Sequence, residues 1–225
     1  SLFWGVSMMY LGDNLEIMRG MEDNSVDLVF TSPPYNRKRN DKYNDFDDRI
    51  DDYFQFLVDR IDEMIRVSRG LVFVNIQKNY YNKRDVYRLM GYYHKELAET
   101  FVWQKSNPMP TSKGQITNAY EFIFAFGDRC KCNTTTIKNH LTTNANSFHS
   151  SKEHRAMMHP EVVRYFLKYF SDSGDVVFDP FMGLGTTAVV CEDLGRKWIG
   201  CEISPHYHAA ALMRIKKEGE QCRLL

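Results

Sequence analysis

The chain lacks the features that mark membrane proteins, secreted proteins and proteins that coat nucleic acid. It has no run of eighteen apolar residues and no charged leader followed by an apolar stretch, so we expect neither a membrane span nor a secretory signal. Its 29 lysines and arginines are balanced by 29 acidic residues, which argues against nonspecific binding along nucleic acid. We therefore expect a cytoplasmic protein whose contacts with any nucleic acid come from local patches.

Cysteine is scarce and irregularly spaced. The five cysteines, an odd number, lack the spacing of a disulfide framework and suit a reducing compartment. Cys130 and Cys132 are the only close pair, and a zinc site would need a second pair. We therefore expect no metal site.

The chain instead alternates short strands with helices. Runs rich in β-branched and aromatic residues predict seven buried strands, at 8–11, 26–30, 71–76, 100–103, 119–126, 176–178 and 198–201. Helical spacing of apolar residues predicts helices at 14–19, 52–67, 84–90, 160–169, 187–194 and 205–216. A chain of 225 residues that is 43% hydrophobic can bury one sizeable core. We predict a single α/β domain over residues 1–225, doubly wound around a mostly parallel seven-stranded sheet.

Two long polar segments interrupt the alternation. Residues 103–121 join two predicted strands without a helix, so those strands should be antiparallel neighbours. Residues 127–158 form a second irregular stretch. Loops of this length inside a compact domain are either functional or disordered, which makes both segments candidates for binding.

A glycine loop near the C-terminus predicts a nucleoside site. The strand at 176–178 is followed by Asp179, by Gly183-x-Gly185 and by a helix, a unit in which glycine lets a ligand approach the backbone closely. Glu202 ends the next strand, where a carboxylate can accept hydrogen bonds from both ribose hydroxyls. This pattern alone fits a nicotinamide dinucleotide or adenosylmethionine. Pro180 and Phe181 favour the latter, because they crowd the place of a pyrophosphate.

A second motif, near the N-terminus, predicts a pocket for an aromatic amine. The strand at 26–30 delivers Thr31 and Ser32 to the carboxyl edge of the sheet, and Pro33-Pro34 then holds the backbone extended. The Ser32 hydroxyl and the Pro33 carbonyl could accept the two amine hydrogens and aim the nitrogen lone pair at an electrophile. Tyr35 could stack on the base that carries the amine.

Together the two motifs resemble those of the amino-methylating DNA methyltransferases, whose cofactor is S-adenosyl-L-methionine. The string DLVFTSPPYN is similar to the amine-gripping motif of that family, and VVFDPFMGLGTTAVVCEDLGRKWIGCEIS to its cofactor loop. The resemblance implies a methyltransferase-type fold and that Asp13 reads the adenine amino group of the cofactor. It implies catalytic roles for Ser32, Pro33, Pro34 and Tyr35. It implies cofactor contacts from Asp13, Thr31, Asp179, Pro180, Phe181, Gly183, Gly185, Thr186, Thr187, Glu202 and His159.

The order of the motifs, with the amine motif first and the cofactor glycines last, resembles the circularly permuted β arrangement of that family. It implies that residues 127–158, with 107–117 beside them, form the surface that reads double-stranded DNA with one base flipped out. This DNA-recognition insert is short for the family, so either the recognised site is short or a second subunit of a homodimer helps to read it. The basic residues that we expect at DNA phosphates are Arg37, Lys38, Arg39, Lys105 and Arg155.

The resemblance implies a site-specific enzyme of a prokaryotic, phage or archaeal-virus host cell, with a companion restriction nuclease as a candidate partner. Ser32 in place of an acid before Pro33-Pro34-Tyr35 favours cytosine N4, with adenine N6 as the alternative. Carbon methylation is not expected, because no cysteine follows a proline as a nucleophile at cytosine C5 would require. RNA methylation, noncatalytic DNA binding and nicotinamide-dependent oxidation remain as remoter alternatives, which cofactor binding and product analysis would separate.

Overall fold

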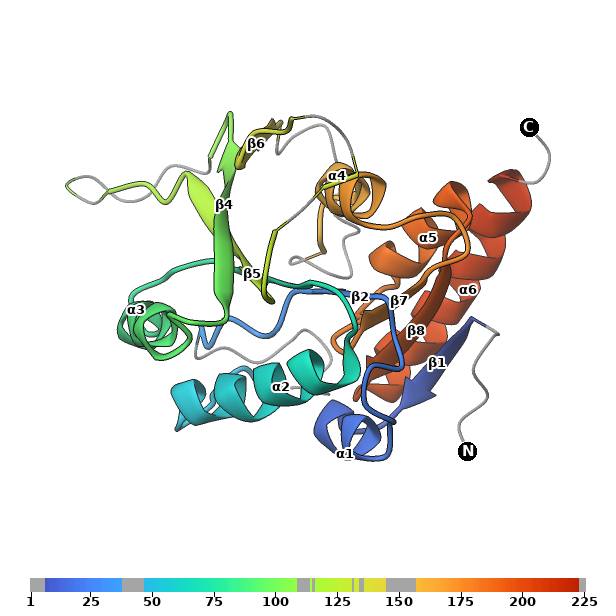
Figure 1. Ribbon diagram of the computed structural model, residues 1–225, viewed down its shortest axis with the longest axis horizontal. Coiled ribbons are helices and arrows are strands. Elements are labelled where there is room, and N and C mark those ends of the chain that lie inside the picture. The colour runs from blue at the N-terminus through green and yellow to red at the C-terminus, as the bar shows by residue number, and fades with distance from the viewer. Residues whose placement is uncertain are drawn as a thin grey trace.

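The computed structural model describes residues 7–37, 47–108, 114, 116–130, 132–133, 136–144 and 157–222. Strands and helices alternate through most of this part of the chain (Figure 1). In chain order the elements are β1 (Met8–Leu11), α1 (Asn14–Arg19), β2 (Leu28–Thr31), α2 (Tyr53–Val67), β3 (Val72–Ile76), α3 (Lys83–Tyr92), β4 (Leu97–Lys105), β5 (Tyr120–Phe126), β6 (His140–Thr143), α4 (Pro160–Phe170), β7 (Val176–Asp179), α5 (Thr186–Leu194), β8 (Lys197–Glu202) and α6 (Pro205–Cys222).

One sheet runs through the molecule, in the order β1-β8-β7-β2-β3-β5-β4-β6. The first five strands in this order are parallel, β5 is antiparallel to both β3 and β4, and β6 is parallel to β4. The predicted doubly wound, mostly parallel fold is confirmed, as is the antiparallel pairing of the strands that flank the long polar segment.

The prediction of seven strands was wrong, because the structure contains an eighth, β6. This strand lies within residues 127–158, which the sequence analysis treated as irregular. Its sequence, HLTT, is short and polar, and only Leu141 is buried, as expected of a strand at the edge of a sheet. Because Leu141 is the single buried residue of β6, the sequence lacks the repeated alternation of apolar and polar residues that predicts a strand.

The two faces of the sheet bury separate cores. Helices α1, α2 and α3 cover one face, and α4, α5 and α6 cover the other (Figure 1). Side chains alternate along each strand, so in β3 Val72 and Val74 face the first layer and Phe73 faces the second. The central strands of the sheet are thus packed against helices on both faces.

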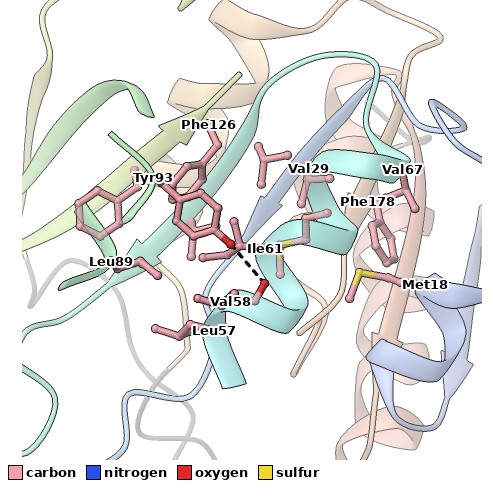
Figure 2. Close-up of a cluster of buried hydrophobic side chains, with 14 of the residues drawn as sticks. Met18, Val29, Leu57, Val58, Ile61, Val67, Leu89, Tyr93, Phe126 and Phe178 are labelled. Carbon is pink, nitrogen blue, oxygen red and sulfur yellow. Dashed lines mark hydrogen bonds between the residues drawn. The ribbon is translucent and has the colours of Figure 1, made fainter. Parts of the chain in front are cut away.

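Helix α2 shows how the first layer is held. Asp52 caps it by accepting a hydrogen bond from the Gln55 backbone N–H at 3.0 Å. One stripe of the helix buries Leu57, Val58 and Ile61, each worth roughly 1.5–3 kcal/mol relative to exposure. Figure 2 shows this cluster, in which the Tyr93 hydroxyl donates to the Val58 carbonyl at 3.3 Å.

Within the described part of the chain, no helix is both long and apolar enough to cross a membrane. The same residues contain no group of three His, Cys, Asp or Glu side chains that could hold a metal ion.

Candidate active site

The two sequence motifs meet at the carboxyl edge of the sheet. β2 and β7 are parallel neighbours, and they end at Thr31 and Asp179. β7 in turn pairs with β8, which ends at Glu202, and β8 pairs with β1, which leads into Asp13. Because the carboxyl ends of parallel strands open at one edge, residues far apart in the sequence gather there. The structure therefore brings the predicted cofactor and amine motifs side by side.

Asp179 connects the two motifs through hydrogen bonds. Its buried carboxylate accepts hydrogen bonds from the hydroxyls of Thr31 and Thr187, both at 2.6 Å, and from the Phe181 backbone N–H at 3.0 Å. Burial raises its pKa from 3.8 to about 6, although these three bonds oppose the rise. The Asp179 and Thr187 side chains thus organise the loop from within it.

The glycine loop holds open space beside the carboxylate of Glu202. Gly183 has a φ of +53°, and a Cβ added to it would meet nothing within 4 Å. Gly185 differs, because its Cβ would lie 2.9 Å from Cδ1 of Ile215 on α6. The Glu202 carboxylate accepts from the backbone N–H groups of Gly183 at 3.0 Å and Ser204 at 2.8 Å, and burial raises its pKa. Gly183 therefore leaves a cradle at the loop, and Gly185 allows α6 to pack.

Asp13 lies near Glu202, because the backbone N–H of the preceding Gly12 donates to the Glu202 carbonyl at 2.9 Å. Asp13 caps α1 by accepting from the Leu15 backbone N–H at 2.7 Å, and Arg60 of α2 approaches its carboxylate at 3.4 Å. The neighbouring Asn14 donates to the Pro180 carbonyl at 2.8 Å and accepts from Arg60 at 2.9 Å. These bonds tie the Asp13 corner to the Pro180–Phe181 turn. Neither Asn14 nor Arg60 was predicted from the sequence as a site residue.

Two further predicted cofactor residues make structural contacts. The Thr186 hydroxyl accepts from Arg214 of α6 at 3.0 Å. His159 caps α4, where its Nδ1 atom accepts from the Glu161 backbone N–H at 3.2 Å. Burial lowers the pKa of His159, which favours the neutral imidazole that such a cap requires.

The amine motif adjoins a cluster of five polar side chains. The Ser32 and Tyr35 hydroxyls are 2.7 Å apart, and Tyr35 donates to the Glu121 carboxylate at 3.0 Å. Asn75 donates to the Tyr35 hydroxyl at 2.6 Å and to Glu121 at 2.7 Å. Lys105 forms an ion pair with the other carboxylate oxygen of Glu121. We call these five residues the polar cluster.

The polar cluster forms because three neighbouring strands present polar residues on one face, at staggered positions: Asn75 pairs with Ile123, and Glu121 pairs with Trp103. Asn75 on β3, Glu121 on β5 and Lys105 on β4 each lie two residues nearer the same edge than a core residue of the second layer. Those core residues are Phe73, Ile123 and Trp103. With a side-chain period of two, the polar residues share the face of the sheet that α4 covers, just beyond the apolar core.

The hydrogen atoms in the polar cluster can be assigned by counting. The Glu121 carboxylate only accepts, so the single proton of the Tyr35 hydroxyl is committed to it. The bond between Ser32 and Tyr35 must then be donated by Ser32. Burial and the charge of Glu121 raise the pKa of Tyr35 well above its usual value, so the phenol stays protonated. The Ser32 oxygen accepts a long hydrogen bond from the Asn75 side chain at 3.5 Å and keeps one lone pair to accept from a further group.

The backbone of the motif is fixed by its carbonyl groups. The Pro34 carbonyl accepts from the Tyr53 hydroxyl at 2.7 Å, and the Tyr35 carbonyl accepts from Asn79 at 2.6 Å and Asn82 at 2.9 Å. No residue in the described ranges donates to the Pro33 carbonyl. The two acceptors predicted for the amine, Ser32 and the Pro33 carbonyl, thus both retain lone pairs.

The predicted DNA contacts divide into three groups. Lys38, Arg39 and Arg155 lie outside the described residues. Arg37 donates to the Gln77 side chain, and its guanidinium lies 5.1 Å from the centre of the Tyr35 ring. Lys105, with only 19% of its side chain exposed, is paired with Glu121.

The insert at 127–158 is partly a structural element. Besides forming β6, it contacts α4, because the Asn133 backbone N–H donates to the Tyr169 carbonyl at 2.9 Å and the Tyr165 hydroxyl donates to the Lys138 carbonyl at 2.6 Å. Residues 131, 134–135 and 145–156 lie outside the described ranges, as do 109–113 and 115 of the neighbouring segment.

Two residues of the polar cluster, Asn75 and Glu121, were missed as site residues. Their sequence signal is a single polar side chain inside an otherwise apolar strand, in VFVNI and in YEFIFAF. A polar group that is 0% exposed in Asn75 and 3% exposed in Glu121 requires internal partners. The sequence shows the anomaly but not the partners, and among the described residues the Asn75 Oδ1 atom has no hydrogen-bond partner at all.

Comparison with known proteins gives consistent matches. A family model described as DNA methylase matches residues 26–213. The type II methyltransferase M.Cfr9I of Citrobacter freundii is 26% identical over 266 residues, covering 93% of this chain and 88% of the relative.

Two solved structures share the fold. The PvuII DNA methyltransferase, described as cytosine-N4-specific, has a TM-score of 0.75 at 21% identity and covers 98% of this chain and 96% of its own. TTHA0409 of Thermus thermophilus, described as a DNA modification methylase complexed with S-adenosyl-L-methionine, has a TM-score of 0.70 at 21% identity, with coverages of 95% and 96%.

Proposed function

Because this chain belongs to the DNA methylase family, we propose that it transfers a methyl group from S-adenosyl-L-methionine to the exocyclic amine of a base flipped out of DNA, at cytosine N4. The observation that carries the proposal is the pair of acceptors at the amine motif. The Ser32 hydroxyl proton is committed to Tyr35, and no described residue uses the Pro33 carbonyl. Two acceptors side by side match the two hydrogens of an amine.

The cofactor fits the cradle between Asp13 and Glu202. Gly183 leaves room for a nucleoside against the backbone, since a Cβ there would enter open space. The part-buried Glu202 carboxylate already accepts from two backbone N–H groups and retains lone pairs for ribose hydroxyls. Phe181 lies 6.0 Å from the Phe56 ring and supplies an apolar wall on which an adenine could lie. When bound, the cofactor supplies an electrophilic methyl group on a sulfonium.

The protein's part in the reaction is to orient the amine. The nitrogen of an aromatic amine is a poor nucleophile, because its lone pair is delocalised into the ring. Ser32 and the Pro33 carbonyl hold its two hydrogens out of the ring plane, which directs the lone pair toward the methyl group. The Thr31–Asp179 hydrogen bond fixes the amine loop to the cofactor loop, so the two reactants are held in one geometry.

Cytosine is favoured because Ser32, a neutral hydroxyl, stands before Pro33-Pro34-Tyr35 in place of an acid. With its proton donated to Tyr35, Ser32 acts toward the base as an acceptor only. Adenine N6 remains the second candidate. The polar cluster favours it in one respect, because Glu121 places a negative charge two hydrogen bonds behind Ser32 and so makes the site resemble one built on an acid.

DNA contacts are proposed at the rim of the pocket. Arg37 is the described cation best placed for a phosphate, since its guanidinium lies beside Tyr35, and Lys38 and Arg39 follow it in sequence. Lys105 could reach a phosphate only by leaving Glu121. Arg155, the reading surface at 127–158, a homodimer, a companion restriction nuclease and a cytoplasmic location remain predictions.

Product analysis tests the proposal directly. The protein is incubated with unmodified genomic DNA and labelled S-adenosyl-L-methionine, and the digested nucleosides are separated by mass spectrometry. N4-methylcytosine is expected. N6-methyladenine would keep the mechanism and overturn the choice of base, whereas binding of the cofactor with no methylated base in DNA would refute DNA as the substrate. Ser32→Ala is the control that should abolish product while cofactor affinity is retained.

A further inference from the structure

Glu121 is a buried acid that does not itself contact the amine in the function proposed above. It is 3% exposed, and all the neighbours bonded to its carboxylate are donors: Lys105 on one oxygen, Tyr35 and Asn75 on the other. Burying an ion pair costs several kcal/mol of desolvation, and apolar residues of similar volume often replace such pairs without loss of stability. Stability alone therefore does not explain why the pair lies beside the amine motif.

We propose that Glu121 is a positioning residue that strengthens Ser32 as an acceptor, acting through the Tyr35 hydroxyl. The inference rests on the proposed function, in which Ser32 holds the target amine. Donation from Tyr35 to Glu121 polarises the phenol O–H bond, which makes the Tyr35 oxygen a better acceptor for the Ser32 proton. Donation from Ser32 in turn concentrates electron density on the Ser32 oxygen that faces the amine.

The chain of bonds has a fixed direction. Because the charged Glu121 carboxylate can only accept, neither the Tyr35 nor the Ser32 hydroxyl can turn its proton in the opposite direction along the chain of bonds. Ser32 is thereby prevented from turning its own proton toward the amine, where it would repel an N–H group. The neutral serine thus acquires, from a carboxylate two hydrogen bonds away, the acceptor character that an acid in its place would have directly.

Asn75 and Lys105 hold the side chains of this hydrogen-bonded series in place. The Asn75 side-chain N–H₂ group bridges the Tyr35 hydroxyl and Glu121, at 2.6 and 2.7 Å, so both ends of the central bond have a common donor. Its orientation is fixed, because the reversed amide would place an oxygen against the carboxylate. Lys105 occupies the far oxygen of Glu121 and directs the near one toward Tyr35.

A double-mutant cycle on Glu121→Gln and Tyr35→Phe tests the proposal. Single-turnover rates of methyl transfer are measured on whichever base the wild type modifies, together with the Kd values for S-adenosyl-L-methionine and for DNA. Glu121→Gln should lower the rate about tenfold, equivalent to about 1.4 kcal/mol, with both Kd values changed less than about twofold. In the Tyr35→Phe background the same substitution should cause no further loss, because the connecting hydroxyl is gone.

Two controls separate this effect from simple loss of packing. Glu192→Gln removes a carboxylate that accepts from the Trp198 indole at 2.9 Å, away from the polar cluster, and should be additive with Tyr35→Phe. The pair Glu121→Gln with Lys105→Met removes both charges, so that no unpaired cation remains to destabilise the fold. It should show the rate loss of Glu121→Gln alone.

The outcomes are distinct. Additive losses from Glu121→Gln and Tyr35→Phe, or a wild-type rate in Glu121→Gln, would overturn the relay through Tyr35. Methylation of adenine with the expected non-additivity would support the relay and overturn only the choice of base. No methyl transfer by the wild-type protein to any DNA would overturn the proposed function and this inference together.

Discussion

Replacing Gly183 with alanine should separate cofactor binding from folding. The residue has a φ of +53°, so a side chain there costs about 1–2 kcal/mol of backbone strain. The added Cβ meets no protein atom within 4 Å, so no packing term is added to this cost. The methyl group instead enters the space in which we place the nucleoside. We expect the free energy of unfolding to fall by about 1–2 kcal/mol and the Kd for S-adenosyl-L-methionine to rise at least about tenfold.

Gly185→Ala is the matched comparison, because it lies two residues away in the same loop. Its Cβ would lie 2.9 and 3.0 Å from two side-chain carbons of Ile215 on α6, so that side chain must move. Overpacking of this kind typically costs 1–3 kcal/mol in addition to the strain at a φ of +80°. Gly185→Ala should therefore be the less stable of the two variants.

Urea denaturation and isothermal titration with S-adenosyl-L-methionine measure the two quantities independently. The expected pattern is a larger loss of stability in Gly185→Ala and a direct loss of affinity in Gly183→Ala that persists at temperatures where the variant is fully folded. Wild-type affinity in folded Gly183→Ala would show that the nucleoside does not lie against this glycine, and the assignment of the cradle would be abandoned.

Other expectations address the remaining assignments. Tyr35→Ala should reduce turnover at least about tenfold with cofactor affinity nearly intact, and Glu202→Ala should first weaken cofactor binding; equal losses of affinity in both would contradict this division. Burial raises the pKa of Asp179 from 3.8 to about 6, so protonation of this carboxylate stabilises the folded protein. This contribution to the free energy of unfolding is lost as the pH rises through 6. The difference in unfolding free energy between wild type and Asp179→Asn should therefore fall by about 2.4 kcal/mol from pH 4 to pH 7, and a flat difference would refute the shift. Substituting the basic residues at 37–39 with glutamine should make the loss of DNA affinity with added salt shallower; an unchanged slope would remove them from the interface.

The sequence by itself determined the arrangement of the site in outline. Apolar runs with a period of two or 3.6 predicted the doubly wound sheet, and the ends of those runs predicted which residues would reach its carboxyl edge. The motifs around Ser32 and Gly183 could be interpreted locally, because prolines and glycines restrict or free the backbone at their own positions. The short polar strand β6 could not be predicted in this way, because its pairing with β4 depends on a partner about 40 residues away in the sequence.

The tertiary structure decided which polar groups face one another. The Asp179 carboxylate, a predicted cofactor contact, accepts from Thr31, which is 148 residues away in the sequence. Lys105, a predicted phosphate contact, forms an ion pair with Glu121 of the adjoining strand β5. Hydrogen bonds and ion pairs act over about 3–4 Å, and no periodicity encodes contacts between distant segments. The sequence determined the edge of the sheet where the two motifs meet, and only the packing of the strands joined Ser32, Tyr35 and Glu121 into one hydrogen-bonded chain.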